Sequence, residues 1–496
     1  MTKKYILSFD QGTSSSRAIL YDNKANIIGK GQRAFSQNYK YKNWVEQDPW
    51  EIFNTQVQAA KDLLKSVDIN LSEVAALGIT NQRETSIIWD RKTGEPIYPA
   101  IVWQDKRTEK QCLKLRKKKG DLIREKTGCV VDSYFSATKI QWILEHVEGA
   151  KERAENGELA FGTVDTWMVW NLTKGKAFIT DHSNASRTLL FNINTLDWDE
   201  ELLELFDIPR ALLPNLVENS GEFANVDSSI FGSEITIGSL LGDQQAALFG
   251  QTCFKKGMLK STYGTGSFML MNTGKQPRFS ENGLLTTVAW TIKGVTHYAV
   301  EGNIFIAGAA IKWLRDNLEI ISSVDDSEYL AYSVKDSGGV TVIPALAGLG
   351  APYWNNNVQG AIIGLTLGTK KEHIVRATLE SLAYRTADML KLMEEESGIK
   401  IKSLAVDGGA SANNFLMQYI SDITRMDVRR PRIIETTSLG SAYMAGLAVG
   451  FWTESQLLEI HKVNKTFKSE ISEDEAEKLY SEWTKIVLHI IDGASL

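Results

Sequence analysis

Two hairpin tips of similar composition lie about half a chain apart, and this repetition constrains the fold more than any other feature. In the first, a β-rich run at residues 4–10 meets the small polar residues 11–16. In the second, a run at 257–263 meets Gly264-Thr265-Gly266-Ser267. Small residues let the chain turn tightly and let a ligand approach the backbone. The repetition predicts two domains of related topology that face each other, spanning residues 1–250 and 251–496.

Strand and helix patterns alternate along the rest of the chain, which is typical of an α/β fold. We predict further strands at 17–21, 26–35, 74–80, 85–89, 99–103, 268–271 and 403–406, and helices at 49–67, 371–397, 413–424 and 439–449. The Lys-rich stretch 106–126 is typical of a solvated helix face. Residues 337–369 carry no charge but contain helix-breaking Gly and Pro, so we predict buried strand and loop packed near a cleft.

Composition excludes several classes of protein. Among 496 residues, 55 Lys and Arg stand against 61 Asp and Glu, and a net charge of −6 argues against a dedicated nucleic-acid binder. Three cysteines without a CxxC pair exclude a disulfide framework and suit a reducing compartment. The first apolar run stops at Asp10, too early for a secretory signal. We therefore predict a cytoplasmic protein with no integral membrane segment.

The first tip is a candidate phosphate loop. Gly12 permits close backbone approach, and the amides and hydroxyls of residues 13–16 can donate hydrogen bonds to phosphate oxygens. Asp10, at the end of the preceding strand, could hold Mg²⁺ directly or through water. The tip fits neither a Walker loop nor a GxGxxG turn, and an ordinary hairpin turn is the alternative.

The second tip is a candidate of the same kind, although Gly-rich hairpin turns are common. Two such tips from two domains would enclose one triphosphate. Farther along, Asp407-Gly408-Gly409 follows a strand and precedes a helix, so a heterocycle and its ribose could approach the backbone there. A plain strand-to-helix turn is the alternative reading of these residues.

Unusual polar groups follow the buried strand at 74–80. The loop 81–84, Asn-Gln-Arg-Glu, offers a guanidinium donor fork beside carboxylate acceptors, which suits vicinal hydroxyls, whereas a surface ion pair is the alternative. Trp103 could form an apolar wall or belong to the core. Asp243 begins a predicted helix, where it could accept the proton of an attacking hydroxyl or simply cap the helix.

Longer motifs give the chain a resemblance to the FGGY carbohydrate kinases. Two extended signatures of that family can be read at residues 134–146 and 360–380. Shorter matches occur at 81–84, 102–104, 162–167, 184–187 and 242–245. The resemblance runs from about Lys4 to about Trp452. It implies an α/β fold of two ribonuclease-H-like (actin-like ATPase) domains around a central cleft, with ATP and Mg²⁺ between them.

The shorter matches narrow the resemblance to members of the family that act on glycerol, and so imply phosphoryl transfer from ATP to glycerol, giving sn-glycerol 3-phosphate. The implied general base is Asp243, and the candidate metal ligands are Asp10 and Asp243. The implied glycerol-binding residues are Arg83, Glu84, Trp103, Tyr134, Asp243, Gln244 and Phe268. The implied nucleotide-binding residues are Thr13, Ser14, Ser15, Arg17, Thr265, Gly308, Lys312, Gly409 and Asn413.

Three positions depart from the pattern that the resemblance leads us to expect. Lys312 stands where members acting on glycerol commonly have Gln, so nucleotide handling can differ. Asp105 creates a WxDxR arrangement similar to that of sugar kinases in the family. Ser229 occupies the position of a regulatory His that a sugar-transport phosphocarrier protein phosphorylates in some relatives, so we predict that this control is absent. Family analogy also implies a homodimer or homotetramer.

Three other functions compete with this interpretation. Another kinase of the same family would act on a pentose, a pentitol or another polyol, but such enzymes generally lack the Arg83-Glu84 pair. An actin-like ATPase that switches partners would need neither a hydroxyl-binding loop nor a base at Asp243. A pure binding protein would leave the paired phosphate hairpins without a role.

Overall fold

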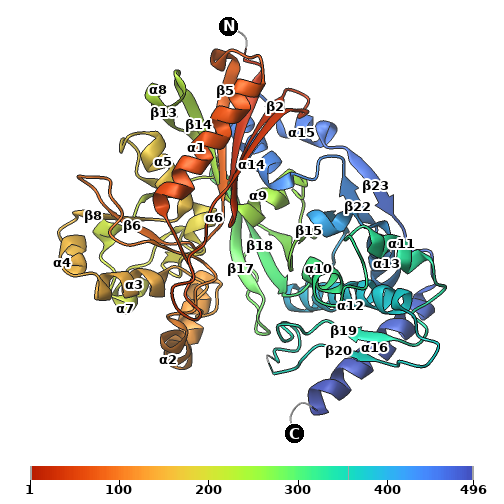
Figure 1. The fold of residues 1–496 in the computed structure, drawn as a ribbon. Coiled ribbons are helices and arrows are strands. Elements are labelled where there is room, and N and C mark those ends of the chain that lie inside the picture. The colour runs from red at the N-terminus through yellow and green to blue at the C-terminus, as the bar shows by residue number, and fades with distance from the viewer. Residues whose placement is uncertain (1–2, 356, 494–496) are drawn as a thin grey trace.

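Two large mixed β-sheets dominate a computed structural model that describes residues 3–355 and 357–493 (Figure 1). The first contains, in spatial order, β13 (Ser220–Val226), β14 (Ile235–Gly242), β5 (Val74–Asn81), β1 (Tyr5–Gln11), β2 (Ser15–Asp22) and β3 (Ile27–Ala34). The second contains β17 (Leu285–Ile292), β18 (Val295–Ile304), β16 (Ser267–Gly274), β15 (Met258–Tyr263), β21 (Ser403–Asp407), β22 (Val428–Pro431) and β23 (Val463–Phe467). No helix of the described residues is long and apolar enough to cross a membrane.

Helices and small two-stranded sheets surround these two sheets. The helices of the first half are α1 (Pro49–Ser66), α2 (Glu109–Thr127), α3 (Ala137–His146), α4 (Ala150–Glu155), α5 (Val164–Leu172), α6 (His182–Ala185), α7 (Glu200–Phe206), α8 (Ser228–Phe231) and α9 (Asp243–Gly250). Those of the second half are α10 (Gly308–Asp316), α11 (Asp326–Tyr332), α12 (Lys371–Ser397), α13 (Asn414–Thr424), α14 (Thr436–Ala448), α15 (Glu454–Ile460) and α16 (Glu473–Gly493). The small sheets pair β4 (Glu46–Gln47) with β7 (Ala100–Ile101), β6 (Ile87–Asp90) with β8 (Leu159–Gly162), β9 (Ile179–Asp181) with β12 (Asn215–Val217), β10 (Phe191–Asn192) with β11 (Asp197–Trp198), and β19 (Thr341–Ile343) with β20 (Ala361–Ile363).

The two large sheets share a central arrangement. In each, the strand that enters the hairpin pairs antiparallel with the strand that leaves it, β1 with β2 and β15 with β16. The entering strand also pairs in parallel with a later strand, β1 with β5 and β15 with β21. The structure therefore has the related topology that the two tips predicted.

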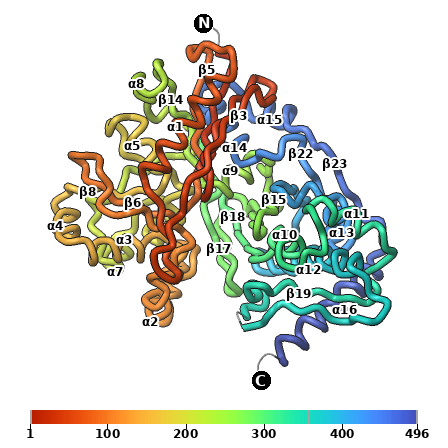
Figure 2. Tube along the Cα trace, in the orientation of Figure 1, coloured from red at the N-terminus to blue at the C-terminus, as the bar shows by residue number. Residues whose placement is uncertain are grey.

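Helices α9 and α14 pack against each other between the sheets. Although α14 comes late in the chain, it contacts β1, β5 and β14 of the first sheet, and in Figure 2 its blue tube lies beside the red tube of the first strands. Glycines permit this close contact. A Cβ atom at Gly440 would lie 1.8 Å from the Ala246 carbonyl oxygen, and one at Gly250 would lie 2.0 Å from that of Thr436.

Most predicted elements occur within three residues of their expected bounds. The helix predicted at 371–397 coincides with α12, and the Lys-rich stretch forms α2, whose lysines are mainly exposed. The strand predicted at 85–89 starts later, as β6, because Thr85 belongs to the turn that ends β5.

The prediction for residues 337–369 was wrong in its last third. Ile343 and Ala345 are buried, and β19 and β20 form a two-stranded sheet. Beyond β20, however, Leu365 is 57% exposed and Leu367 is fully exposed. The absence of charge did not predict burial here, because β20 pairs only with β19 in a two-stranded sheet and the residues after it extend beyond that sheet.

Candidate active site

The carboxyl ends of three neighbouring parallel strands, β1, β5 and β14, meet at one edge of the first sheet. Their last residues are register partners, Gln11 with Asn81 and Gly242 with Asn81. The first hairpin tip, the turn after β5 and the start of α9 therefore begin side by side. Ligands of open α/β sheets bind at such strand ends.

The turn after β5 is tight and strained. Glu84 has a φ angle of 61°, a left-handed conformation that costs a non-glycine residue about 1–3 kcal/mol. The Thr85 amide donates to the Arg83 carbonyl at 2.7 Å, and the Ser136 hydroxyl donates to the Glu84 carbonyl at 2.9 Å. The turn holds two buried, oppositely charged side chains next to each other, so the surface ion pair considered for them is wrong.

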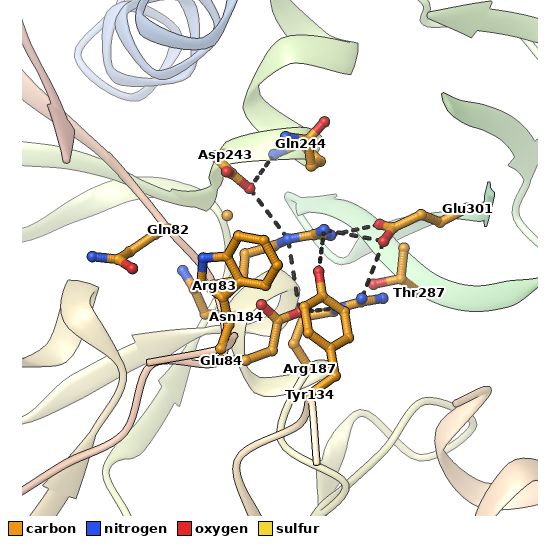
Figure 3. Close-up of polar contacts among 12 residues, drawn as sticks. Gln82, Arg83, Glu84, Tyr134, Asn184, Arg187, Asp243, Gln244, Thr287 and Glu301 are labelled. Atoms are coloured by element: carbon orange, nitrogen blue, oxygen red, sulfur yellow. Dashed lines mark hydrogen bonds and ion pairs between the residues drawn. The ribbon is translucent and has the colours of Figure 1, made fainter. Parts of the chain in front are cut away.

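Arg83, Glu84, Arg187 and Glu301 form a buried charge cluster (Figure 3). Glu301 accepts hydrogen bonds from Arg83 Nη1 at 2.6 Å, from Arg83 Nη2 at 3.1 Å and from Arg187 Nη2 at 3.1 Å. Arg187 Nε donates to Glu84 Oε1 at 2.7 Å. Two cations and two anions thus compensate one another in a region where a lone charge would be very costly.

Ion pairing decides which groups of the charge cluster stay ionised. Burial works against ionisation of Glu301, but Arg187 and Arg83 lower its pKa to about 2. Burial raises the pKa of Glu84, and the same two arginines oppose that rise. Burial also disfavours the Arg83 cation, yet Glu301 and its other anionic neighbours raise the pKa of Arg83 well above its usual range. Glu301 is therefore the anion on which the two arginines depend most.

Asp243 is the first residue of α9 and approaches the charge cluster from a more open side. Its Oδ1 lies 3.2 Å from Arg83 Nε and accepts a hydrogen bond from the backbone N–H of Gln244 at 2.7 Å. Its side chain is 29% exposed, whereas that of Arg83 is 2% exposed. Gly242 is the N-cap residue of α9, so the capping role considered for Asp243 is wrong. An accessible carboxylate oriented by a buried arginine can accept a proton from a bound hydroxyl.

An aromatic wall joins the charge cluster to the first hairpin tip. Arg83 Nη2 donates to the Tyr134 hydroxyl at 3.4 Å, and the Tyr134 and Trp103 rings meet edge to face at 5.6 Å. Trp103 Nε1 in turn donates to Thr13 Oγ1 at 3.0 Å. Trp103 is half-buried and reaches a predicted phosphate-binding residue, which a purely core aromatic would not do.

The first tip is a tight turn in which polar side chains remain at least partly accessible. The Gly12 amide donates to the Ser15 carbonyl at 3.0 Å, and Thr13 and Ser14 lie in the turn, half-buried and exposed respectively. Ser15 begins β2, and its hydroxyl accepts from Gln32 Nε2 at 3.3 Å. Backbone and hydroxyl donors thus gather at the end of β1.

Asp10 is the buried carboxylate beneath this tip. It faces Arg17 in the β1–β2 register, and Arg17 Nη1 lies 3.4 Å from Asp10 Oδ2 and 3.4 Å from Glu435 Oε2. Burial raises the pKa of Asp10 to about 6, although Arg17 partly opposes the rise. The carboxylate is therefore incompletely compensated, which fits a place where a cation binds.

Backbone groups of the second half converge at the second tip. The Gly264 amide donates to the Gly266 carbonyl at 2.9 Å, and the Gly308 amide donates to the Gly264 carbonyl at 2.9 Å. Gly408 has a φ angle of 83°, and a Cβ atom there would lie 2.6 Å from the Tyr263 carbonyl oxygen. The second tip, the start of α10 and the Gly408-Gly409 turn therefore touch one another.

The other residues predicted for the nucleotide lie around this junction. Thr265 and Gly409 are exposed, and Lys312 is exposed on α10. Asn413 caps α13 through its Oδ1, which accepts from the Leu416 amide at 2.9 Å. Capping of α13 therefore occupies Oδ1 of Asn413 without any ligand.

Within residues 3–355 and 357–493, no group of three or more His, Cys, Asp or Glu side chains could hold a metal ion by itself. Magnesium bound to a nucleotide needs fewer protein ligands, because one or two carboxylates combine with phosphate oxygens and water. Asp10 lies near the end of β1 and Asp243 follows β14, the two strands that flank β5, and the carboxylate of Asp243 is one of the groups that raise the pKa of Asp10. They fit that smaller requirement.

The sequence interpretation missed several residues of the site. Arg187 was noticed within a family motif but given no role, and Glu301 was not noticed at all. The sequence offered a way to find Glu301, since it is the one carboxylate in the largely buried strand β18. Lys260, a buried lysine on β15, was missed as well.

Asp105 lies in a different network from the charge cluster. Arg107 Nη2 donates to its Oδ2 at 2.9 Å, and the Val45 amide donates to the same atom at 2.7 Å. Arg107 also stacks on Trp44, with its guanidinium carbon 3.8 Å from the ring centre. These contacts give Asp105 a structural role next to Arg107 and Val45.

An α/β fold of two related halves, with a buried charge cluster and two hairpin tips at its strand ends, is typical of the sugar and polyol kinases. Residues 5–250 match the N-terminal domain, and residues 259–449 the C-terminal domain, of the FGGY family of carbohydrate kinases. The chain belongs to this family.

Within the family, the chain is similar to glycerol kinases. It is 56% identical to that of Thermoanaerobacter sp. (strain X514) over 486 residues, which cover 98% of each chain. It is 54% identical to glycerol kinase 2 of Thermotoga maritima, again with 98% of each chain covered.

Solved structures agree in fold. The chain matches the crystal structure of Plasmodium falciparum glycerol kinase with ADP at a TM-score of 0.93 and 36% identity, covering 99% of this chain and 98% of that one. It matches ligand-bound xylulose kinase from Lactobacillus acidophilus at a TM-score of 0.87 and 20% identity, covering 98% of both chains. The predicted actin-like ATPase fold is confirmed by these matches.

Proposed function

We propose that the chain transfers the γ-phosphoryl group of ATP to glycerol, giving ADP and sn-glycerol 3-phosphate. The observation that carries the proposal is the contact between Asp243 and the buried charge cluster, which sets an accessible carboxylate 3.2 Å from the guanidinium of Arg83. The identity of 54–56% with glycerol kinases supports the choice of acceptor.

The acceptor would be recognised by paired polar groups. Glycerol offers three hydroxyls and little apolar surface, so a wrong ligand is rejected when buried donors and acceptors stay unpaired. Arg83, Glu84, Tyr134 and Gln244 would bind the hydroxyls. Trp103 and Phe268 would flank the carbon chain.

Asp243 would orient the attacking hydroxyl and accept its proton as the oxygen–phosphorus bond forms. Because the transition state of phosphoryl transfer is loose, the base need not be strong. Closure of the two halves would exclude water, the competing acceptor.

The nucleotide would lie between the two tips. Thr13, Ser14, Ser15, Arg17 and Thr265 would contact its phosphates, while Gly308, Lys312, Gly409 and Asn413 would complete the site. Mg²⁺, held by Asp10 and Asp243, would neutralise charge on the phosphates. We place the boundary between the two domains near residue 250.

The same proposal covers partners and control. We expect a cytoplasmic homodimer or homotetramer that is not phosphorylated by a sugar-transport phosphocarrier, because Ser229 takes the place of the regulatory His. Ser229 is exposed on α8, at the far end of the β13–β14 hairpin. Phosphate transfer from the carrier to this chain would contradict that expectation.

A coupled ADP-release assay tests the activity. Mg-ATP would be supplied with glycerol, with several pentoses and pentitols, and with no acceptor. We expect turnover with glycerol. We expect Arg83→Ala to lower kcat/KM for glycerol by ~10²–10³-fold, mainly through KM, since the variant removes a hydroxyl-binding guanidinium and leaves Glu301 paired with Arg187 alone.

Arg33→Ala is the matched control, because Arg33 is a half-exposed residue of β3 that pairs with Asp62. Turnover with another polyol instead of glycerol would support the proposed mechanism but contradict the proposed substrate. Equal rates with and without any acceptor would leave an ATPase and reject the proposal.

A further inference from the structure

Lys260 is a buried ammonium for which neither the family signatures nor the charge cluster supplies a role. It lies on β15, and its side chain has no exposed surface. Its Nζ donates to Gln244 Oε1, to the Thr262 hydroxyl at 2.9 Å and to the Phe268 carbonyl at 3.3 Å. All three acceptors are neutral, so the charge is held without a direct counterion. Such a group is expensive to bury and calls for a specific explanation.

The three acceptors belong to three parts of the proposed site. Gln244 is the second residue of α9, next to Asp243, whereas Thr262 and Phe268 flank the second tip on β15 and β16. Lys260 therefore ties the first turn of α9 to the strands of the second sheet. At the other end of α9, Gln251 Nε2 donates to Asp407 Oδ2 at 2.7 Å. The helix is thus fixed at both ends against the second sheet.

The chemistry of an ammonium adds a second constraint. Lysine only donates, so Gln244 must turn its amide oxygen toward Lys260 and keep its NH₂ group for a ligand. A neutral amine or an apolar side chain would let that amide rotate.

We propose that protonated Lys260 is a positioning residue for phosphoryl transfer, which fixes Gln244 and the Asp243 end of α9 at their distance from the second tip. This inference rests on the proposed kinase activity. It concerns how the two halves of the site are aligned, and Lys260 itself need not touch either substrate.

The surroundings of Lys260 make its charge sensitive to pH. Burial lowers its pKa to about 8, while the carboxylates of Asp407, Asp243 and Glu301 oppose the fall and Arg83 adds to it. The ammonium is therefore present below about pH 8 and lost above it. Rate measurements can report that loss, since misplacement of a reacting group by about 1 Å costs up to ~10²-fold.

The test is the pH dependence of kcat/KM for ATP at saturating glycerol, in the wild type, Lys260→Met and Lys260→Arg. We expect Lys260→Met to lower this constant ~10–10²-fold at pH 7. We expect the wild-type constant to fall above about pH 8 toward the value of that variant, which should be flat from pH 7 to 9.5. Lys260→Arg, which keeps the charge, should recover part of the rate and lack the alkaline fall.

Lys139→Met is the matched control, because Lys139 is a second buried lysine whose pKa burial lowers to about 8. It donates to the Tyr134 carbonyl at 2.6 Å, on the acceptor side, so its loss should leave the alkaline fall in place. Binding of ADP and the thermal midpoint check that each variant is folded. If Lys260→Met does not fold, Gln244→Ala replaces it and should also abolish the fall.

The outcomes separate the two proposals. A wild type that phosphorylates no polyol rejects the proposed function. An active wild type with an unchanged rate in Lys260→Met, or with the same alkaline fall in that variant, rejects the role of Lys260 alone.

Discussion

The acceptor side and the nucleotide side of the proposed site are built from different groups. On the acceptor side, buried side chains carry the structure, since Arg83, Arg187 and Glu301 hold one another in fixed ion pairs. On the nucleotide side, the backbone carries the structure: the Gly308 amide donates to the Gly264 carbonyl, and the exposed Thr265 lies next to them in the chain. Deleting a side chain should therefore harm the first side most, and adding one should harm the second side most.

The ligands explain the difference. A polyol presents a few hydroxyls that must be matched in direction, and buried charged groups reject what does not match. A triphosphate presents many oxygens with high charge, so backbone amides at tight turns are sufficient, and glycine lets them approach.

The largest effect should follow a change at Asp243. Asp243→Asn keeps the shape and the contact with Arg83 but removes the proton acceptor, and we expect kcat for glycerol phosphorylation to fall ~10²–10⁴-fold. The coupled ADP-release assay measures the rate, and binding of ADP checks that the nucleotide side is intact. Turnover within threefold of wild type would show that Asp243 is not the base.

Glu301→Gln should have the next largest effect. It keeps the size of the side chain but leaves Arg83 and Arg187 with less compensation, so we expect about 3 kcal/mol lower unfolding free energy and roughly 10²-fold lower kcat/KM for glycerol. KM for ATP should change far less. Equal losses for both substrates would contradict the division between the two sides.

The effect of Glu301→Gln on stability should depend on pH. The pKa of Glu301 is lowered to about 2, so its stabilising contribution is complete above its ordinary pKa near 4.5 and is lost as pH falls toward 2. The gap in thermal stability between the wild type and Glu301→Gln should therefore narrow between pH 5 and pH 3. A gap that is constant over this interval would mean that Glu301 pairs with the arginines less strongly than the geometry indicates.

The sequence predicted the framework of the site better than its interior. Strand ends, hairpin tips and the turn at Arg83-Glu84 follow from local patterns, because turn chemistry and strand periodicity are local properties. Glu301 and Arg187 were not assigned because their role arises from contacts between residues more than 100 positions apart. Packing of α14 on the first sheet was hidden for the same reason.

The nucleotide side can be tested by comparing an addition with a deletion. In Gly266→Ala the new Cβ would lie 2.5 Å from the Ile304 carbonyl oxygen, and we expect about tenfold lower kcat/KM for ATP from the forced backbone shift. In Thr265→Ala one exposed hydroxyl is lost, and we expect kcat/KM for ATP to fall about threefold. A larger loss in Thr265→Ala than in Gly266→Ala would mean that side chains, rather than backbone, bind the phosphates.

The smallest effect is expected at Lys312, which is exposed in the middle of α10. We expect its ammonium to attract the phosphates of ATP across solvent, without direct contact. Lys312→Gln should then raise KM for ATP by about twofold at low salt, and this difference should disappear at about 0.5 M salt because ions screen the attraction. Lys402→Gln, at another exposed lysine of the second half, is the control. A change of tenfold or more that persists in high salt would place Lys312 in direct contact with a phosphate. The nucleotide side would then resemble the acceptor side in depending on a charged side chain.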